Sequence, residues 1–127
     1  MAYVTLIAML ALVEYLYFMV AVGGARGRTG IKAPATSGDP EFERFFRVHQ
    51  NTLEQLIVFI PALYATAFYA NELYAIIVGV LFLIGRAMYF LAYSKDAEKR
   101  GPGALVTMLA NVALVAGGIV GAVLQIV

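Results

Sequence analysis

The chain has 127 residues, of which 62% are hydrophobic and 13% are charged, and its mean hydropathy is +0.83. A water-soluble domain carries about a quarter charged residues, so this composition excludes most soluble folds and indicates a protein whose solvent is lipid. The sequence has no cysteine, which excludes a disulfide framework, a thiolate metal site and a cysteine nucleophile. Any thiol chemistry must therefore come from a substrate or cofactor.

Four apolar segments follow one another along the chain. The first covers residues 2–24 and, at about 1.5 Å per residue, reaches roughly 34 Å, enough to cross a hydrocarbon core of about 30 Å. We expect it to stay in the mature protein, because no basic segment precedes it and its apolar run is longer than that of a signal peptide. The others cover residues 42–70, 73–93 and 103–126. The sequence therefore predicts an all-α integral membrane protein, a single domain over residues 1–127 with four transmembrane helices in an antiparallel bundle.

The basic residues are distributed unevenly around these segments. Eight of the nine lie in or beside two polar loops, residues 25–41 and 94–102, whereas the turn at Asn71-Glu72 on the other side has none. The positive-inside rule then places both polar loops in the cytoplasm and both termini on the opposite face. The membrane would be a bacterial inner membrane or the endoplasmic reticulum.

Two polar stripes enter the predicted spans from the loop side. The first comprises Arg47, Asn51 and Glu54, and the second comprises Arg86, Tyr89 and Tyr93, followed by Arg100. Spacings of three and four residues place each stripe on one helical face. Charged residues at membrane depth cost about 2.5–3.5 kcal/mol each on insertion scales and usually face a partner or a wet cavity. An ion pair between Glu54 and Arg86 that only fixes helix packing is one interpretation, and the excess of arginine over carboxylate favours an anionic ligand.

The side chains in these stripes match the groups of one small molecule. An arginine guanidinium suits a carboxylate, because it can donate two parallel hydrogen bonds to it. A carboxylate with an asparagine suits a primary amine. Tyrosine hydroxyls with a further arginine suit a thiolate. Glutathione carries all of these groups, although the spacing alone does not single it out.

Longer motifs in the same segments resemble a known family. The run FERFFRVHQNTLE at residues 42–54, followed by GRxxYFxxY at residues 85–93 and by Lys99-Arg100, resembles the membrane-associated proteins in eicosanoid and glutathione metabolism, the MAPEG family. HQNTLE is similar to the type 3 microsomal glutathione transferases, whereas residues 89–100 also resemble the type 2 enzymes and leukotriene C synthase. The resemblance implies a homotrimer of four-helix subunits in the lipid bilayer. It further implies that glutathione is a co-substrate bound in cytoplasm-facing sites between subunits, and that an apolar electrophile arrives from the lipid.

The resemblance also implies roles for single residues. Arg100 matches the arginine that stabilises the glutathione thiolate, and a cation beside a thiol of pKa about 8.5 favours the nucleophilic form. Glutathione contacts are matched by Arg47, Asn51, Glu54, Tyr89 and Tyr93 from one subunit and by Arg26 and His49 from its neighbour. Arg86 matches a basic position at the site, with an intramembrane helix contact as the alternative. No metal site is expected, because His49 is the only histidine and no second ligand is suitably spaced.

Four positions bear on how far the family's pattern extends. Gln55 stands where a tyrosine often follows the glutamate, and Pro61 lies one turn beyond the usual place of the proline. The arginine implicated as a proton donor in leukotriene C synthase falls on Gly27, so that role is not carried over. Glu14, inside the first span, matches no motif residue. It either pairs with an arginine, faces a central trimer axis or packs between helices.

Three classes of function are compatible with these features. A membrane glutathione transferase, with glutathione-dependent reduction of lipid hydroperoxides as an additional activity, is favoured. A non-catalytic lipid-binding scaffold like the five-lipoxygenase-activating protein is disfavoured, because that protein lacks the arginine that matches Arg100. A small transporter or channel has little support, since no pair of helices is broken by glycine and proline. No nucleic-acid partner is expected.

We predict that a reporter fused after Val127 gives an extracytoplasmic signal, because both basic loops should be retained on the cytoplasmic side. The measurement is a paired fusion with alkaline phosphatase and with a fluorescent protein. The same pair fused after Ser37, in the first basic loop, should give the opposite result. A cytoplasmic signal at Val127 would contradict the four-span topology.

Overall fold

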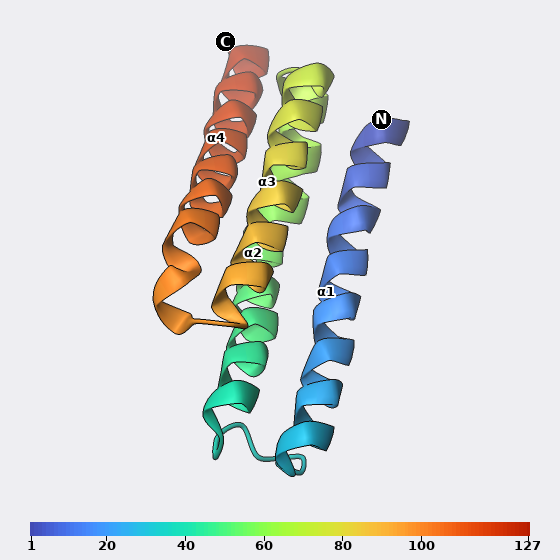
Figure 1. The fold of residues 1–127 in the computed structure, drawn as a ribbon. Coiled ribbons are helices and arrows are strands. Elements are labelled where there is room, and N and C mark those ends of the chain that lie inside the picture. Colours follow the sequence, from blue (N-terminus) through green and yellow to red (C-terminus); the bar gives the residue numbers. More distant parts are fainter.

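The computed structural model describes residues 1–127, and every regular element in it is a helix (Figure 1). The long helices are α1 (Ala2–Thr29), α2 (Pro40–Tyr69), α3 (Glu72–Tyr93) and α4 (Gly101–Ile126), and a short 3-10 helix, η1 (Ala97–Arg100), precedes α4. By length and composition, four helical segments are long and apolar enough to cross a membrane. The predicted all-α architecture is therefore confirmed, and its four long apolar helices are consistent with four membrane spans.

Side-chain caps fix where two of the helices begin. Asp39 accepts hydrogen bonds from the backbone N–H groups of Glu41 at 2.8 Å and Phe42 at 3.1 Å, and Pro40 occupies the first helical position of α2. Asn71 accepts a hydrogen bond from the N–H of Tyr74 at 2.8 Å and so starts α3. These residue types satisfy the free N–H groups of a helix terminus, so both boundaries follow from the local sequence.

The end of α1 was predicted wrongly. The helix continues five residues past Gly24 to Thr29, and the connecting loop is correspondingly shorter than residues 25–41. Gly30 ends the helix in the left-handed conformation with φ of 73°, and its N–H donates to the carbonyl of Arg26. The apolar run marks the part that fits in lipid, whereas a helix continues until its carbonyls are capped. Likewise η1 and the start of α4 occupy much of the predicted loop at residues 94–102.

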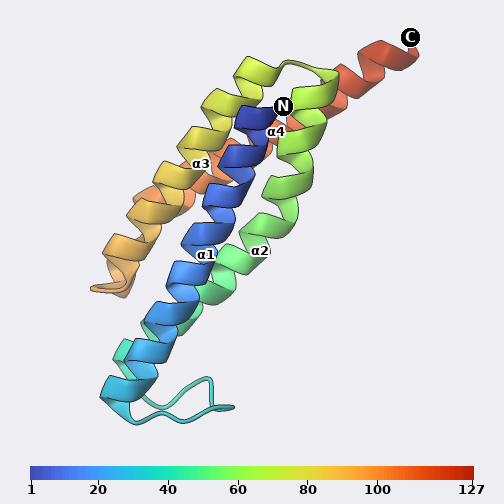
Figure 2. The same ribbon diagram turned by 90° about the vertical axis from the view of Figure 1, so that its right-hand side faces the viewer.

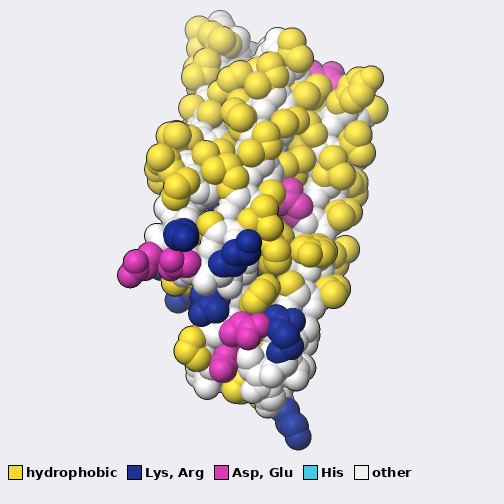
Figure 3. All heavy atoms as spheres, viewed as in Figure 1, with side chains coloured by type: hydrophobic (Ala, Val, Ile, Leu, Met, Phe, Trp, Pro, Cys, Tyr) yellow, Lys and Arg dark blue, Asp and Glu magenta, His cyan; other side chains and the backbone are white.

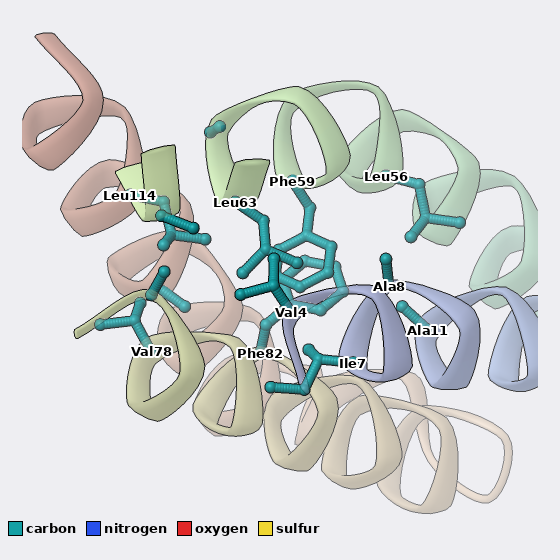
Figure 4. Packing of buried hydrophobic residues seen from close by; sticks show 14 residues of the cluster. Val4, Ile7, Ala8, Ala11, Leu56, Phe59, Leu63, Val78, Phe82 and Leu114 are labelled. Carbon is teal, nitrogen blue, oxygen red and sulfur yellow. The ribbon is translucent and has the colours of Figure 1, made fainter. Parts of the chain in front are cut away.

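The core lies between the inner faces of all four helices. At its centre Phe59 of α2 and Phe82 of α3 are fully buried, and their rings stack with centroids 3.7 Å apart. Figure 4 shows these rings between Val4 of α1, Ile7 of α1 and Leu63 of α2. The outer surfaces carry large exposed apolar side chains, which form the broad band seen in Figure 3. Helices that are apolar both toward the core and on their outer surfaces are expected of a bundle immersed in lipid.

The two ends of the bundle differ in charge. Both chain termini and the α2–α3 turn lie at one end, and the α1–α2 and α3–α4 connections lie at the other (Figures 1 and 2). The Lys and Arg side chains visible in Figure 3 gather at the second end, below the apolar band. In both ribbon views the α1–α2 hairpin extends beyond the α3–α4 connection at this end. The two polar loops therefore share one end of the molecule, as the sequence predicts.

Glycines bring α4 into contact with its neighbours. A Cβ on Gly103 would lie 2.5 Å from the backbone nitrogen of Tyr89, and one on Gly121 would lie 2.6 Å from the carbonyl carbon of Tyr69. Gly117 likewise faces Thr66 within the same chain. These small residues therefore allow close helix packing inside one subunit.

We predict that Gly103→Ala lowers the free energy of unfolding by about 1–3 kcal/mol, because the added methyl group must push α4 away from the backbone of α3. The measurement is the denaturation midpoint of the purified protein in detergent. Gly101→Ala is the matched control, since a Cβ there has nothing within 4 Å. Equal stability of the two variants would show that the α3–α4 approach is not tight.

Candidate functional site

A polar pocket of about 260 Å³ opens near the basic end of the bundle. Its lining consists of Arg47, Asn51, Glu54, Tyr89, Tyr93 and Arg100. The helical spacing of three and four residues on α2 and α3 brings the two stripes face to face, and η1 adds the last arginine. The structure therefore brings six of the predicted site residues together in one place.

The floor of this pocket is buried and its rim is exposed. Tyr89 and Tyr93 are 4% and 8% exposed, and their rings stack with centroids 5.4 Å apart. Arg47, Glu54 and Arg100 are exposed at the rim. Neither rim arginine makes an ion pair with a carboxylate of the chain. Two arginines against one glutamate leave an excess positive charge, so the pocket is suited to an anionic ligand that also has a cationic group.

Arg86 lies behind the pocket instead of lining it. Its side chain is 1% exposed, and its guanidinium donates to Asn51 Oδ1 at 2.8 Å, Thr107 Oγ1 at 3.0 Å and, more weakly, Thr52 Oγ1 at 3.4 Å. The guanidinium carbon also stands 4.4 Å from the ring centre of Tyr89. Arg86 thus holds two pocket residues from beneath.

The suggested ion pair between Glu54 and Arg86 is not formed. No carboxylate lies within 4.0 Å of the Arg86 guanidinium, and Glu54 instead accepts a long hydrogen bond of 3.5 Å from Asn51 Nδ2. Asn51 stands between the two charged groups, with its oxygen toward Arg86 and its nitrogen toward Glu54. Arg86 is therefore solvated by neutral oxygens and by an aromatic face.

Two other predicted contacts lie away from this pocket. Arg26 donates to the carbonyl of Ala35 at 2.8 Å and stands over the ring of Phe42, whereas His49 stacks on Tyr15 with ring centroids 4.5 Å apart. Neither lines the pocket of its own chain. Their assignment to a neighbouring subunit, which the family resemblance implies, stays a prediction.

Glu14 has no ion-pair partner within the chain. One of its carboxylate oxygens is buried without a hydrogen bond, and no cation of the chain lies within 4.0 Å of it. Glu14 is therefore neither an ion-pair partner of Arg86 nor part of the polar pocket.

Sequence reasoning did not identify Thr52 and Thr107 as part of this arrangement. Both are fully buried, and both accept hydrogen bonds from Arg86 while donating to a backbone carbonyl of their own helix. For Thr107 the local signal is a threonine isolated in an apolar span, because a buried hydroxyl needs a partner, whereas Thr52 lies in the polar run HQNTLEQ and gives no such signal.

Comparisons with known proteins identify the family of this chain. Residues 4–120 match the model of the MAPEG family. The chain is 40% identical over 121 residues to an uncharacterised protein of Synechocystis, a match that covers 95% of this chain and 88% of the relative.

Two named enzymes are also similar. Human microsomal glutathione S-transferase 2 is 38% identical over 97 residues, covering 76% of this chain and 66% of the human protein. Mouse leukotriene C4 synthase is 36% identical over 100 residues, covering 76% of this chain and 67% of the mouse protein. The family match spans nearly the whole chain and both polar stripes, so this four-helix membrane protein belongs to the MAPEG family.

Proposed function

We propose that the protein is a membrane glutathione transferase that joins the glutathione thiolate to apolar electrophiles and also reduces lipid hydroperoxides. The observation that carries the proposal is the polar pocket, which gathers two arginines, a carboxylate, an amide and two tyrosines at the basic end of the bundle. The similarity to a microsomal glutathione S-transferase and to leukotriene C4 synthase supports the same reaction class.

One carboxylate, the amine and the thiol of glutathione each have a partner in this pocket. Arg47 binds a carboxylate and Glu54 binds the amine. Asn51, whose oxygen accepts from Arg86, donates to the Glu54 carboxylate and positions it. Arg100 and the hydroxyls of Tyr89 and Tyr93 surround the thiol. The cation lowers the pKa of that thiol from its usual value of about 8.5, so that more of it is present as thiolate at neutral pH. The thiolate then attacks an electrophile that reaches the pocket through lipid.

In this proposal the site faces the cytoplasm and is shared between subunits of a homotrimer. Arg47, Glu54 and Arg100 are exposed in the single chain, so the pocket is open where a neighbour would close it. Arg26 and His49 of that neighbour supply the remaining contacts, as the family resemblance implies.

We predict that Arg100→Ala abolishes the ultraviolet absorbance of bound thiolate and slows conjugation to a model electrophile. The reason is that the thiol pKa returns toward its free value, and each pKa unit corresponds to about 1.4 kcal/mol. Glutathione binding should persist in part, because the carboxylate and amine contacts are separate. Lys99→Ala is the matched control: this neighbouring cation pairs with Asp96 and does not line the pocket.

Arg47→Ala should show the opposite pattern, a higher glutathione concentration at half-maximal rate with a smaller effect on the saturated rate. If both substitutions leave conjugation unchanged, the transferase proposal fails. If the unmodified protein turns over no electrophile or hydroperoxide with glutathione, it fails as well, and the lipid-binding scaffold becomes the better interpretation.

We predict that the detergent-solubilised protein has about three times the mass of the 13.7 kDa chain. The measurement is light scattering or native mass spectrometry with the detergent contribution subtracted. A protein that is monomeric at every concentration at which it binds glutathione would contradict the shared site.

A further inference from the structure

A second and larger pocket adjoins the polar pocket at the basic end of the bundle. This outer pocket has a volume of about 750 Å³, and its walls come from the α1–α2 loop, the first turns of α2, the end of α3 and the start of η1. The two pockets share Arg47 and Tyr93, so they are continuous there. The charged side chains that line the outer pocket are Glu43, Arg44, Arg47, Lys95 and Asp96.

The outer pocket has unpaired charges of both signs. Arg44 is half-buried, and its only side-chain hydrogen bond goes from Nε to the carbonyl of Ser94 at 3.1 Å, which leaves its terminal nitrogens free. Glu43 and Lys95 are exposed, and neither they nor Arg44 form an ion pair within the chain. Asp96 is occupied, because it caps η1. Free cationic groups beside one free carboxylate suit a small molecule with carboxylates and an amine.

The two pockets repeat the same combination of charges. Glu54 stands beside arginines in the polar pocket, and Glu43 stands beside Arg44 and Lys95 in the outer pocket. Glutathione has a single amine, which needs only one of these two glutamates. Glu43 and Glu54 are also separated by about 16 Å along α2, at about 1.5 Å per residue, so one amine does not reach both. The outer pocket is therefore suited to a second molecule of the same charge type.

The lack of cysteine gives a second thiol molecule a chemical role. When the glutathione thiolate reduces a hydroperoxide, an S–O bond forms, the O–O bond breaks, and the alkoxide takes up a proton to become the alcohol. The glutathione is left as its sulfenic acid, which a thiol converts to a disulfide. Residues 1–127 contain no cysteine, so this thiol has to come from a small molecule.

We propose that the outer pocket binds a second glutathione, whose thiol attacks the sulfenic acid formed on the first. This inference rests on the hydroperoxide-reducing activity proposed above and assigns that activity a further binding site. The second thiolate attacks the sulfur of the sulfenic acid, an S–S bond forms, the S–O bond breaks, and hydroxide leaves as water with the proton that the second thiol lost. The hydroperoxide is thus reduced by two electrons, and two thiols are oxidised to glutathione disulfide. Tyr93 lies where the two sulfurs meet, because it lines both pockets.

The first experiment tests the second site without any turnover. Glutathione disulfide should occupy both pockets at once, whereas glutathione should fill the polar pocket first. Arg44→Gln and Lys95→Gln each remove a cation that lines the outer pocket only. We expect them to raise the Kd of glutathione disulfide about 10-fold and about 3-fold, and to leave the tighter Kd of glutathione within about 2-fold. The measurement is isothermal titration calorimetry in detergent. Lys32→Gln is the matched control, since this exposed lysine lines neither pocket.

The second experiment compares two reactions of the same variants. Conjugation to a model electrophile consumes one glutathione, whereas reduction of a hydroperoxide consumes two. Arg44→Gln and Lys95→Gln should raise the glutathione concentration at half-maximal hydroperoxide reduction by about the same factors, and leave that for conjugation within about 2-fold. Dimedone, which traps sulfenic acids, should capture more glutathione adduct in these variants, because the second thiol arrives more slowly.

The outcomes separate this proposal from the proposed function. Equal weakening of glutathione and of its disulfide would show that one glutathione fills both pockets, and would overturn the proposal. Unchanged binding of the disulfide, or an unchanged glutathione dependence of hydroperoxide reduction, would also overturn it. The Lys95 side chain makes no ion pair within the chain, so Lys95→Gln keeps the test decisive if Arg44→Gln does not fold. If disulfide binding is weakened selectively but the unmodified protein reduces no hydroperoxide, that activity fails while the second binding site stands.

Discussion

The buried guanidinium of Arg86 is the interaction on which the polar part of this bundle depends. A cation inside a membrane span is costly, and here no carboxylate lies close enough to form an ion pair with it. Its hydrogen bonds go to Asn51 of α2 and Thr107 of α4, and its face contacts the ring of Tyr89. Three helices are thus tied together at one level, and the same bonds orient two of the residues that line the polar pocket.

Close helix packing makes the contacts of Arg86 possible. Thr107 can meet Arg86 because Gly103 lets α4 approach the backbone of α3 at Tyr89, and Gly85 faces Thr107 directly. Without a hydrophobic driving force between helices in lipid, such small residues and interhelical hydrogen bonds supply most of the specificity. The glycines and the polar network therefore depend on each other, and a change in either would shift the side chains that line the polar pocket.

Two neighbouring recesses of the bundle differ in polarity. The polar pocket near the basic end is lined by charged and polar side chains, whereas a groove between α2 and α4 is lined by apolar side chains except for Gln55 and Asn111. Glu54 and Gln55, adjacent in sequence, face one recess each.

The sequence by itself determined the four spans, the grouping of basic residues at one end and the six side chains of the polar pocket. Hydropathy and helical spacing are local properties, and each polar stripe lies on a single helix. Helix α1 ends later than predicted, because a helix stops at its cap and not at the edge of its apolar run. Only the tertiary structure decided that Arg86 lies beneath the pocket with Asn51 and Thr107, and that Gln55 turns toward Asn111. Those partners are on different helices, and their pairing depends on helix rotation and approach, which no local pattern encodes.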